Sequence, residues 1–334
     1  MLRFYKSNHP LVVVLVFLAL ILLHAYTFYR PSFYTDEFIN PLSRVLILSL
    51  NIIPLKQLFV QNILSILIVF TQALYFNKIL DKYKIVERGN YLGAYVFILL
   101  SCMFRNFLFL SPALIVNVLL LVEIDLLFSI NKKEKVSSQL FDLGFVIAMA
   151  SLLYFPSLAF LLFLFFGVLI LRPFRIGEWL VLLIGAIVPY FLSAVYFFWF
   201  DRLPEFFNNI TFRKVMNEEF GFITNVQIIL ISSLVFIALI WSLLKIQQNY
   251  FKALVQIRNY FAVLLLFSLL GFTTVFLQSN VRVENFIWLV IPVATALSYS
   301  LPRIKKWWMA EVFHLILFLL IIYFQFENQL NLFE

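Results

Sequence analysis

Long apolar runs alternate with short polar gaps along the chain, and most of the runs are long enough to cross a membrane as helices. An α-helix rises 1.5 Å per residue, so about 20 apolar residues cover the roughly 30 Å hydrocarbon core of a bilayer. The pattern predicts an all-α polytopic transmembrane helix bundle of about eleven spans. They are residues 11–29, 58–77, 90–104 and 107–130, two short spans within 136–171, and residues 179–200, 226–244, 260–277, 286–301 and 309–325.

Two stretches depart from this pattern. Residues 136–171 hold one charged side chain, Asp142, and would make a single helix of roughly 54 Å. Two short spans that turn near Pro156 fit a bilayer better. Residues 39–57 are apolar but are interrupted by Pro and by charged side chains, which predicts an interfacial helix.

Positive charges gather at every second gap between the runs. Of the 25 Lys and Arg residues, 17 lie in one set of alternate gaps, which begins with the N-terminal segment, and eight lie in the other set. Because cytoplasmic loops carry the excess of Lys and Arg, this asymmetry predicts that the N-terminus lies inside and the C-terminus outside. The largest outer loop is then residues 201–225.

The composition agrees with a membrane protein and argues against a soluble protein that binds nucleic acid. The chain is 63% hydrophobic with a mean hydropathy of +0.99, so membrane lipid must solvate its apolar surface. The net charge of +8 would suggest nucleic acid in a soluble protein, but the basic gaps explain it here, and we expect no nucleic-acid partner. We expect a single integral domain, residues 1–334, in the bacterial inner membrane.

Few residues carry familiar chemistry. The chain has eight Gly, three His and one Cys, Cys102, and lacks a Gly-rich phosphate loop and a histidine metal motif. Any chemistry must therefore come from carboxylates and basic side chains.

Asp36 and Glu37 are the first candidates, because they follow the first span on the predicted outer side. Their carboxylates could deprotonate an acceptor hydroxyl or hold a divalent cation. The structural alternative is a solvated loop in which Thr35 or Asp36 caps the next helix, and on the residues alone it is the commoner outcome.

The outer loop at 201–225 is the second candidate. Its basic side chains could bind a phosphate, and its acidic pair could bind a cation or activate an acceptor; the alternative is an amphipathic interfacial segment. The residues concerned are Arg202, Arg213, Lys214, Glu218 and Glu219.

Other polar residues lie within the spans. Glu123 and Asp125 suggest function, since acids in a bilayer are costly, but they could also pair with Lys132 and Lys133. His24 and Glu311 are expected at the interface. Two further pairs are expected to bond helices to one another, Asn117 with Ser111 and Thr273 with Thr274.

The order of an outer acidic step at 34–37, an amphipathic segment and many short-looped spans resembles the C-superfamily of membrane glycosyltransferases. The resemblance implies a catalytic or cation-associated acid at Asp36 or Glu37, a polyprenyl-phosphate-linked sugar as donor, and donor binding by the 201–225 loop. The second outer loop, Arg105-Asn106, lacks the acid that many members carry there.

Residues 142–190 also resemble small multi-span inner-membrane proteins of Bacteroidota, a resemblance that implies no known activity. It rests on Tyr154-Phe-Pro-Ser and on an elbow from Arg172 to Trp179. There Pro173 would break a helix, and Arg172 and Arg175 would anchor to lipid head groups.

Three classes of function remain open on these grounds. The first is a glycosyltransferase-like enzyme that acts on a lipid-linked sugar at the outer face. The second is a non-catalytic subunit or assembly factor of an envelope complex. The third is a transporter of a small solute or lipid, which the sequence favours least because its spans hold few polar groups near the midplane.

Overall fold

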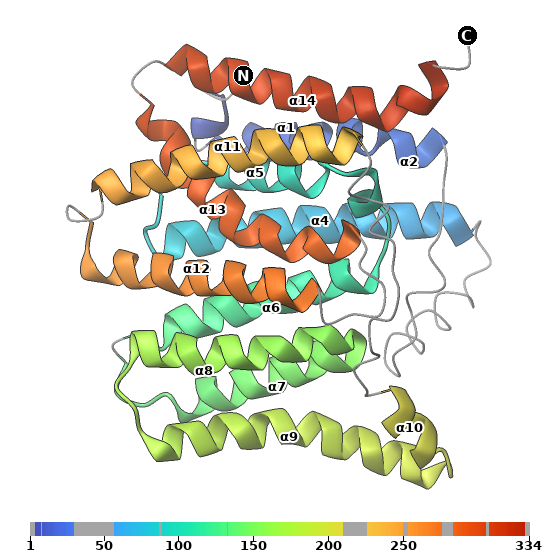
Figure 1. The fold of residues 1–334 in the computed structure, drawn as a ribbon, viewed down its shortest axis with the longest axis vertical. Helices are drawn as coiled ribbons and strands as arrows, with labels where there is room; N and C mark the ends of the chain where they lie inside the picture. Colours follow the sequence, from blue (N-terminus) through green and yellow to red (C-terminus); the bar gives the residue numbers. More distant parts are fainter. Residues whose placement is uncertain are drawn as a thin grey trace.

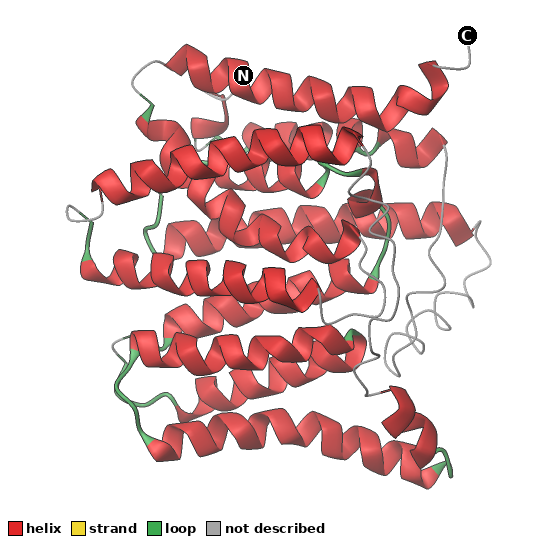
Figure 2. Cartoon of the chain, in the orientation of Figure 1, coloured by secondary structure: helices red, strands yellow, loops and turns green. Residues whose placement is uncertain are grey.

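The computed structural model describes residues 4–7, 9–29, 57–86, 89–131, 133–209, 226–249, 253–275, 283–304 and 307–330. Within these ranges the chain is all-α and contains no strand (Figure 2). The predicted interfacial helix at 39–57 lies outside the described residues except for Gln57, which begins a helix.

The helices follow the predicted runs closely. The α-helices are α1 (Leu11–Leu23), α2 (Ala25–Tyr29), α4 (Gln57–Lys82), α5 (Leu92–Ser101), α6 (Pro112–Ser129), α7 (Ser137–Leu153), α8 (Phe160–Leu171), α9 (Ile176–Trp199), α10 (Leu203–Asn209), α11 (Val226–Asn249), α12 (Val255–Val275), α13 (Val290–Ser300) and α14 (Trp307–Leu330). Short 3₁₀ helices are η1 (Phe4–Lys6), η2 (Arg105–Leu108), η3 (Phe155–Ala159), η6 (Val283–Leu289) and η7 (Leu301–Arg303).

Successive long helices run back and forth, so the connections fall at two ends of the bundle (Figure 1). We call the end with the connections after α4, α6, α8, α11 and α13 the basic end, at the left of Figure 1, and the other the opposite end. The N-terminal segment lies at the basic end, because the Tyr91 N–H donates to the Tyr5 carbonyl at 2.8 Å and Lys6 stacks on Trp307.

Seven of the described helical segments are long and apolar enough to cross a membrane, and four shorter apolar helices accompany them. Many large apolar side chains of α9, α11 and α14 face outward, among them Ile187, Ile237 and Leu319 at 61%, 65% and 55% exposure. Such surface requires lipid as its solvent. The chain is therefore a multi-pass membrane protein in contact with membrane lipid.

The predicted break in residues 136–171 is confirmed. The run forms α7 and α8, with η3 between them around Pro156, and the two helices lie side by side (Figure 1). The first run, in contrast, breaks at His24 into α1 and α2, which the hydropathy pattern did not predict.

Helices α7 and α9 touch through their backbones. A Cβ atom added to Gly144 would lie 2.0 Å from the Leu182 carbonyl oxygen, and one added to Gly185 would lie 2.2 Å from the Phe141 carbonyl oxygen. Glycine permits this close approach, which gives van der Waals contact where lipid offers no hydrophobic driving force. Helix α9, at one edge of the bundle, depends on this contact for its position.

Candidate functional site

The two predicted acids of the first outer loop, Asp36 and Glu37, lie outside the described residues. The chain enters that segment from α2 at Tyr29 and leaves it at Gln57, and both positions lie at the opposite end (Figure 1). Of the predicted phosphate-binding loop, Arg213, Lys214, Glu218 and Glu219 also lie outside the described residues.

Arg202 is described and lies at the opposite end, just before α10. Its guanidinium is exposed and pairs with Glu205 at 2.7 Å, an interaction that raises the pKa of Arg202. The structure therefore keeps Arg202 charged beside an acid rather than presenting it alone to a ligand.

A cluster of buried polar side chains lies at the same end, and the sequence did not predict it as a cluster. His24 is fully buried in the bundle, and its Nδ1 lies 3.1 Å from the Leu20 carbonyl and 3.6 Å from the Cys102 sulfur. Arg105 donates to the Gln325 carbonyl at 2.8 Å and stacks 4.4 Å above the Tyr26 ring. These residues come from the first helices, the end of α5, η2 and α14.

An acid lies beside the second short loop. Asn106 donates to the Glu284 carboxylate at 2.6 Å, and Glu284 is only 2% exposed. The neighbouring Asn285 accepts from Tyr154 at 2.7 Å. Many membrane glycosyltransferases carry an acid in the second outer loop, whereas the Arg105-Asn106 loop of this chain has none. Glu284 of η6, far along the chain, places an acid beside that loop.

Several buried polar atoms at the opposite end have no hydrogen-bond partner within the described structure. They are Nε2 of His24, both amide atoms of Gln61, Oγ of Ser101, Nε of Arg105, Oγ of Ser157 and Oε1 of Gln325. Nearer the basic end the same holds for both carboxylate oxygens of Glu123, Oγ of Ser298 and Nδ1 of His314. Buried polar groups normally bond to protein or to ordered water, so this concentration is a feature that needs a partner.

An apolar groove of about 390 Å³ adjoins the cluster. Residues of α5, α11, α12, η6 and α13 line it, among them Phe104, Phe236, Phe272 and Phe286. Met103 and Phe104 in the groove directly precede Arg105 and Asn106 of the cluster. Val283 and Phe286 of the groove flank Glu284 and Asn285 in the same way.

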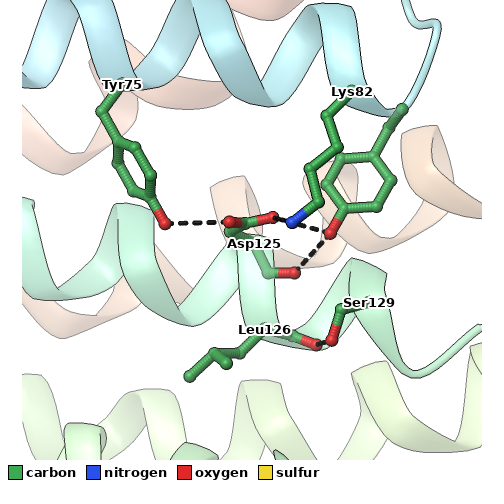
Figure 3. A network of polar contacts seen from close by, with 6 residues as sticks. Tyr75, Lys82, Asp125, Leu126 and Ser129 are labelled. Carbon is green, nitrogen blue, oxygen red and sulfur yellow. Dashed lines mark hydrogen bonds and ion pairs between the residues drawn. The ribbon is translucent and has the colours of Figure 1, made fainter.

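The two acids inside α6 have different environments. Asp125 is held by Lys82 at 2.6 Å and by Tyr75 at 2.9 Å, as Figure 3 shows. Tyr83, just past α4, donates to the same carboxylate at 2.6 Å, and burial together with this acid raises the pKa of Tyr83. The partner of Asp125 is thus Lys82 of α4 and not Lys133, while Lys132, the other lysine considered, lies outside the described residues.

Glu123 is fully buried, and neither carboxylate oxygen has a partner within the described residues. It lies one turn from Leu127, whose side chain packs against Gly167 of α8. An ionised carboxylate without a partner in such surroundings is strongly disfavoured, so the neutral acid fits this position.

The predicted hydrogen bonds between helices are present at one of the positions named above and absent at the others. Asn117 bonds α6 to α4 by donating to Gln72 at 3.0 Å, as expected of an interhelical contact. Ser111, however, caps its own helix by accepting from the Leu114 N–H. Thr273 and Thr274 both donate to carbonyls within α12, so they do not join helices as expected.

The elbow before α9 also differs from expectation. Arg172 is 8% exposed and donates to both carboxylate oxygens of Glu178, at 3.0 and 3.2 Å, and to backbone carbonyls of Ile130 and Lys133. A side chain so enclosed does not anchor to head groups, whereas the exposed Arg175 is placed to do so.

The described residues hold no group of three or more His, Cys, Asp or Glu side chains that could bind a metal ion.

The chain belongs to the family described as Family of unknown function (DUF6427), which matches residues 42–333. A search of curated proteins gave no match. The multi-pass helical architecture and this membership define the class, and the family carries no assigned activity.

Proposed function

We propose that the protein spans the bacterial inner membrane eleven times, with its basic end in the cytoplasm, and acts at the outer face on a lipid-linked sugar. The orientation is supported by the basic side chains of the described connections, which gather at one end. They are Lys82, Lys84, Lys133, Lys135, Arg172, Arg175 and Arg303.

The observation that carries the proposal is the contact between the apolar groove and the polar cluster at the opposite end. A polyprenyl phosphate has a long apolar tail and an anionic, sugar-bearing head, so its binding site needs both surfaces side by side. The chain supplies them from the same two segments, 103–106 and 283–286. The Nε of Arg105, which no described residue pairs with, is a donor that the head group of such a ligand could use.

The transfer itself would follow the pattern of the membrane glycosyltransferases that the sequence resembles. The acceptor oxygen bonds to the anomeric carbon, the bond from that carbon to the phosphate oxygen breaks, and the acceptor proton passes to a carboxylate. Asp36 or Glu37 is the proposed base, and the 201–225 loop is the proposed phosphate contact.

Binding is tested first, with the purified full-length protein and a photoreactive polyprenyl phosphate. Ser232→Trp fills the groove, and we expect it to reduce cross-linking about tenfold, the loss that 1.4 kcal/mol of binding energy would cause. The matched control is Ser233→Trp, because Ser233 is exposed on the same helix and does not line the groove. Equal cross-linking in all three proteins would refute the groove as the tail site.

Catalysis is tested separately with a panel of polyprenyl-phosphate hexoses. Asp36→Asn or Glu37→Gln is expected to abolish sugar transfer while leaving cross-linking and yield unchanged. If both variants transfer sugar at the normal rate, the enzyme proposal is wrong. Cross-linking that survives beside this result would leave a lipid-binding subunit as the better assignment.

A further inference from the structure

We propose that a second pocket, at the basic end, binds a phosphate group of an anionic membrane lipid. The pocket has a volume of about 370 Å³ and lies where the connections after α4 and α11 meet the end of α13. Lys84, Asn249 and Arg303 are among its lining residues, and none of the described lining residues is acidic. The site is distinct from the groove at the opposite end and does not depend on the proposed function.

Arg303 is held in place within this pocket. Its guanidinium stacks 3.6 Å from the centre of the Tyr299 ring and donates to the Tyr299 carbonyl. A fixed, planar guanidinium is suited to phosphate, because it presents several N–H donors without loss of side-chain freedom on binding.

Lys84 is held by its backbone. The Ile85 N–H donates to the Leu80 carbonyl at 3.0 Å and the Lys84 N–H to the Asp81 carbonyl at 3.3 Å, the pattern of a Schellman motif that ends α4. Lys84 occupies the left-handed position of this motif, with φ at 54°. Glycine is the usual residue there, since it adopts positive φ without cost. A lysine at this position is a strained choice for the backbone, and it places an ammonium at the pocket.

The surroundings favour a lipid as the source of the phosphate. The pocket also has apolar walls, from Ile85, Val86 and Ile257, and Leu254 at its rim is 63% exposed. Basic pockets at the ends of membrane helices are suited to the head groups of anionic lipids. A soluble phosphate would bind to the same cations but would gain nothing from the apolar rim.

The test uses variants that remove each charge with little structural cost. Lys84→Gly removes the ammonium and relieves the positive φ, so we expect the protein to stay folded. Asp201→Gly is the matched backbone control, because Asp201 occupies the same motif after α9, also with φ at 54°, at the opposite end. Lys135→Ala is the charge control, an exposed lysine at the basic end outside the pocket. Arg303→Gln removes the second cation.

Binding is measured on the full-length protein in neutral detergent, by native mass spectrometry with dioleoylphosphatidylglycerol, dioleoylphosphatidylcholine or inorganic phosphate. The protein should retain phosphatidylglycerol over phosphatidylcholine, and Lys84→Gly and Arg303→Gln should each weaken this binding about fivefold. Asp201→Gly and Lys135→Ala should leave it unchanged. Normal binding by Lys84→Gly, or an equal loss in the controls, would overturn the proposal. Retention of phosphate without a preference for phosphatidylglycerol would overturn the lipid source and keep the phosphate site.

Discussion

At the basic end, the buried guanidinium of Arg172 donates to both carboxylate oxygens of Glu178 and to two backbone carbonyls. The Asp125 carboxylate at the same end accepts from Lys82 and from two tyrosines. At the opposite end, Gln61 is buried with neither amide atom paired among the described residues, and the buried Gln325 lacks a partner there for its Oε1. The basic end thus uses Arg172 and Asp125 to hold helices together, although Glu123, Ser298 and His314 keep unpaired atoms nearer that end. The opposite end keeps more polar atoms that pair with no described residue, which is what a ligand site requires.

The largest effect should come from Arg172, because its partners are buried with it. Arg172→Met leaves the enclosed Glu178 carboxylate with only the distant, exposed Arg175 as a cation, and we expect the free energy of unfolding to fall by about 3–5 kcal/mol. Arg175→Met is the control, since Arg175 is 63% exposed and lies 3.8 Å from the same acid, and it should cost less than about 1 kcal/mol. Unfolding in detergent, followed by circular dichroism, measures both.

The double variant Arg172→Met with Glu178→Leu sharpens this test. Replacing a whole buried pair by apolar residues is often close to neutral, so the double variant should recover most of the loss. A double variant as unstable as Arg172→Met alone would mean that the two carbonyl contacts, not the ion pair, stabilise the elbow.

Much of this fold follows from the sequence, because hydropathy has a local signature. Each predicted run contains a helix, and the break at η3 was predicted from the length of the run and the position of Pro156. The candidate site does not follow in the same way. Arg105 meets the backbone of Gln325 across 220 positions, and Asn106 meets Glu284 across 178. No periodic pattern records such pairs, although a Glu-Asn step at the start of a span, as at Glu284, is a signal worth noting.

The next effect concerns Asp125, whose carboxylate joins α6 to the end of α4. Asp125→Asn keeps an acceptor but removes the charge that Lys82 and Tyr83 face, and we expect a loss of about 1–3 kcal/mol in unfolding free energy. Lys82→Met should cost less, under about 1 kcal/mol, because the lysine side chain is 46% exposed and solvent weakens its contribution. Equal losses would show that the tyrosine contacts contribute little and that the ion pair alone holds this end.

The smallest effects should be changes of opposite sign in the unfolding free energy, caused by substitutions at Asn62 and at its neighbour Gln61 in α4. Asn62 donates to the Thr27 carbonyl at 2.8 Å, so Asn62→Leu leaves that carbonyl unpaired and should lower the unfolding free energy by about 1 kcal/mol.

Gln61 is 3% exposed with neither amide atom paired within the described residues. Gln61→Leu removes a buried polar group that pairs with no described residue and should raise the unfolding free energy by about 1 kcal/mol in detergent without added lipid. If the unpaired atoms at the opposite end serve a ligand, the gain should shrink when a polyprenyl phosphate is added, because only the wild-type amide can bond to it. A loss of stability in Gln61→Leu without ligand would contradict the contrast between the two ends, since it would show that the fold already uses this amide.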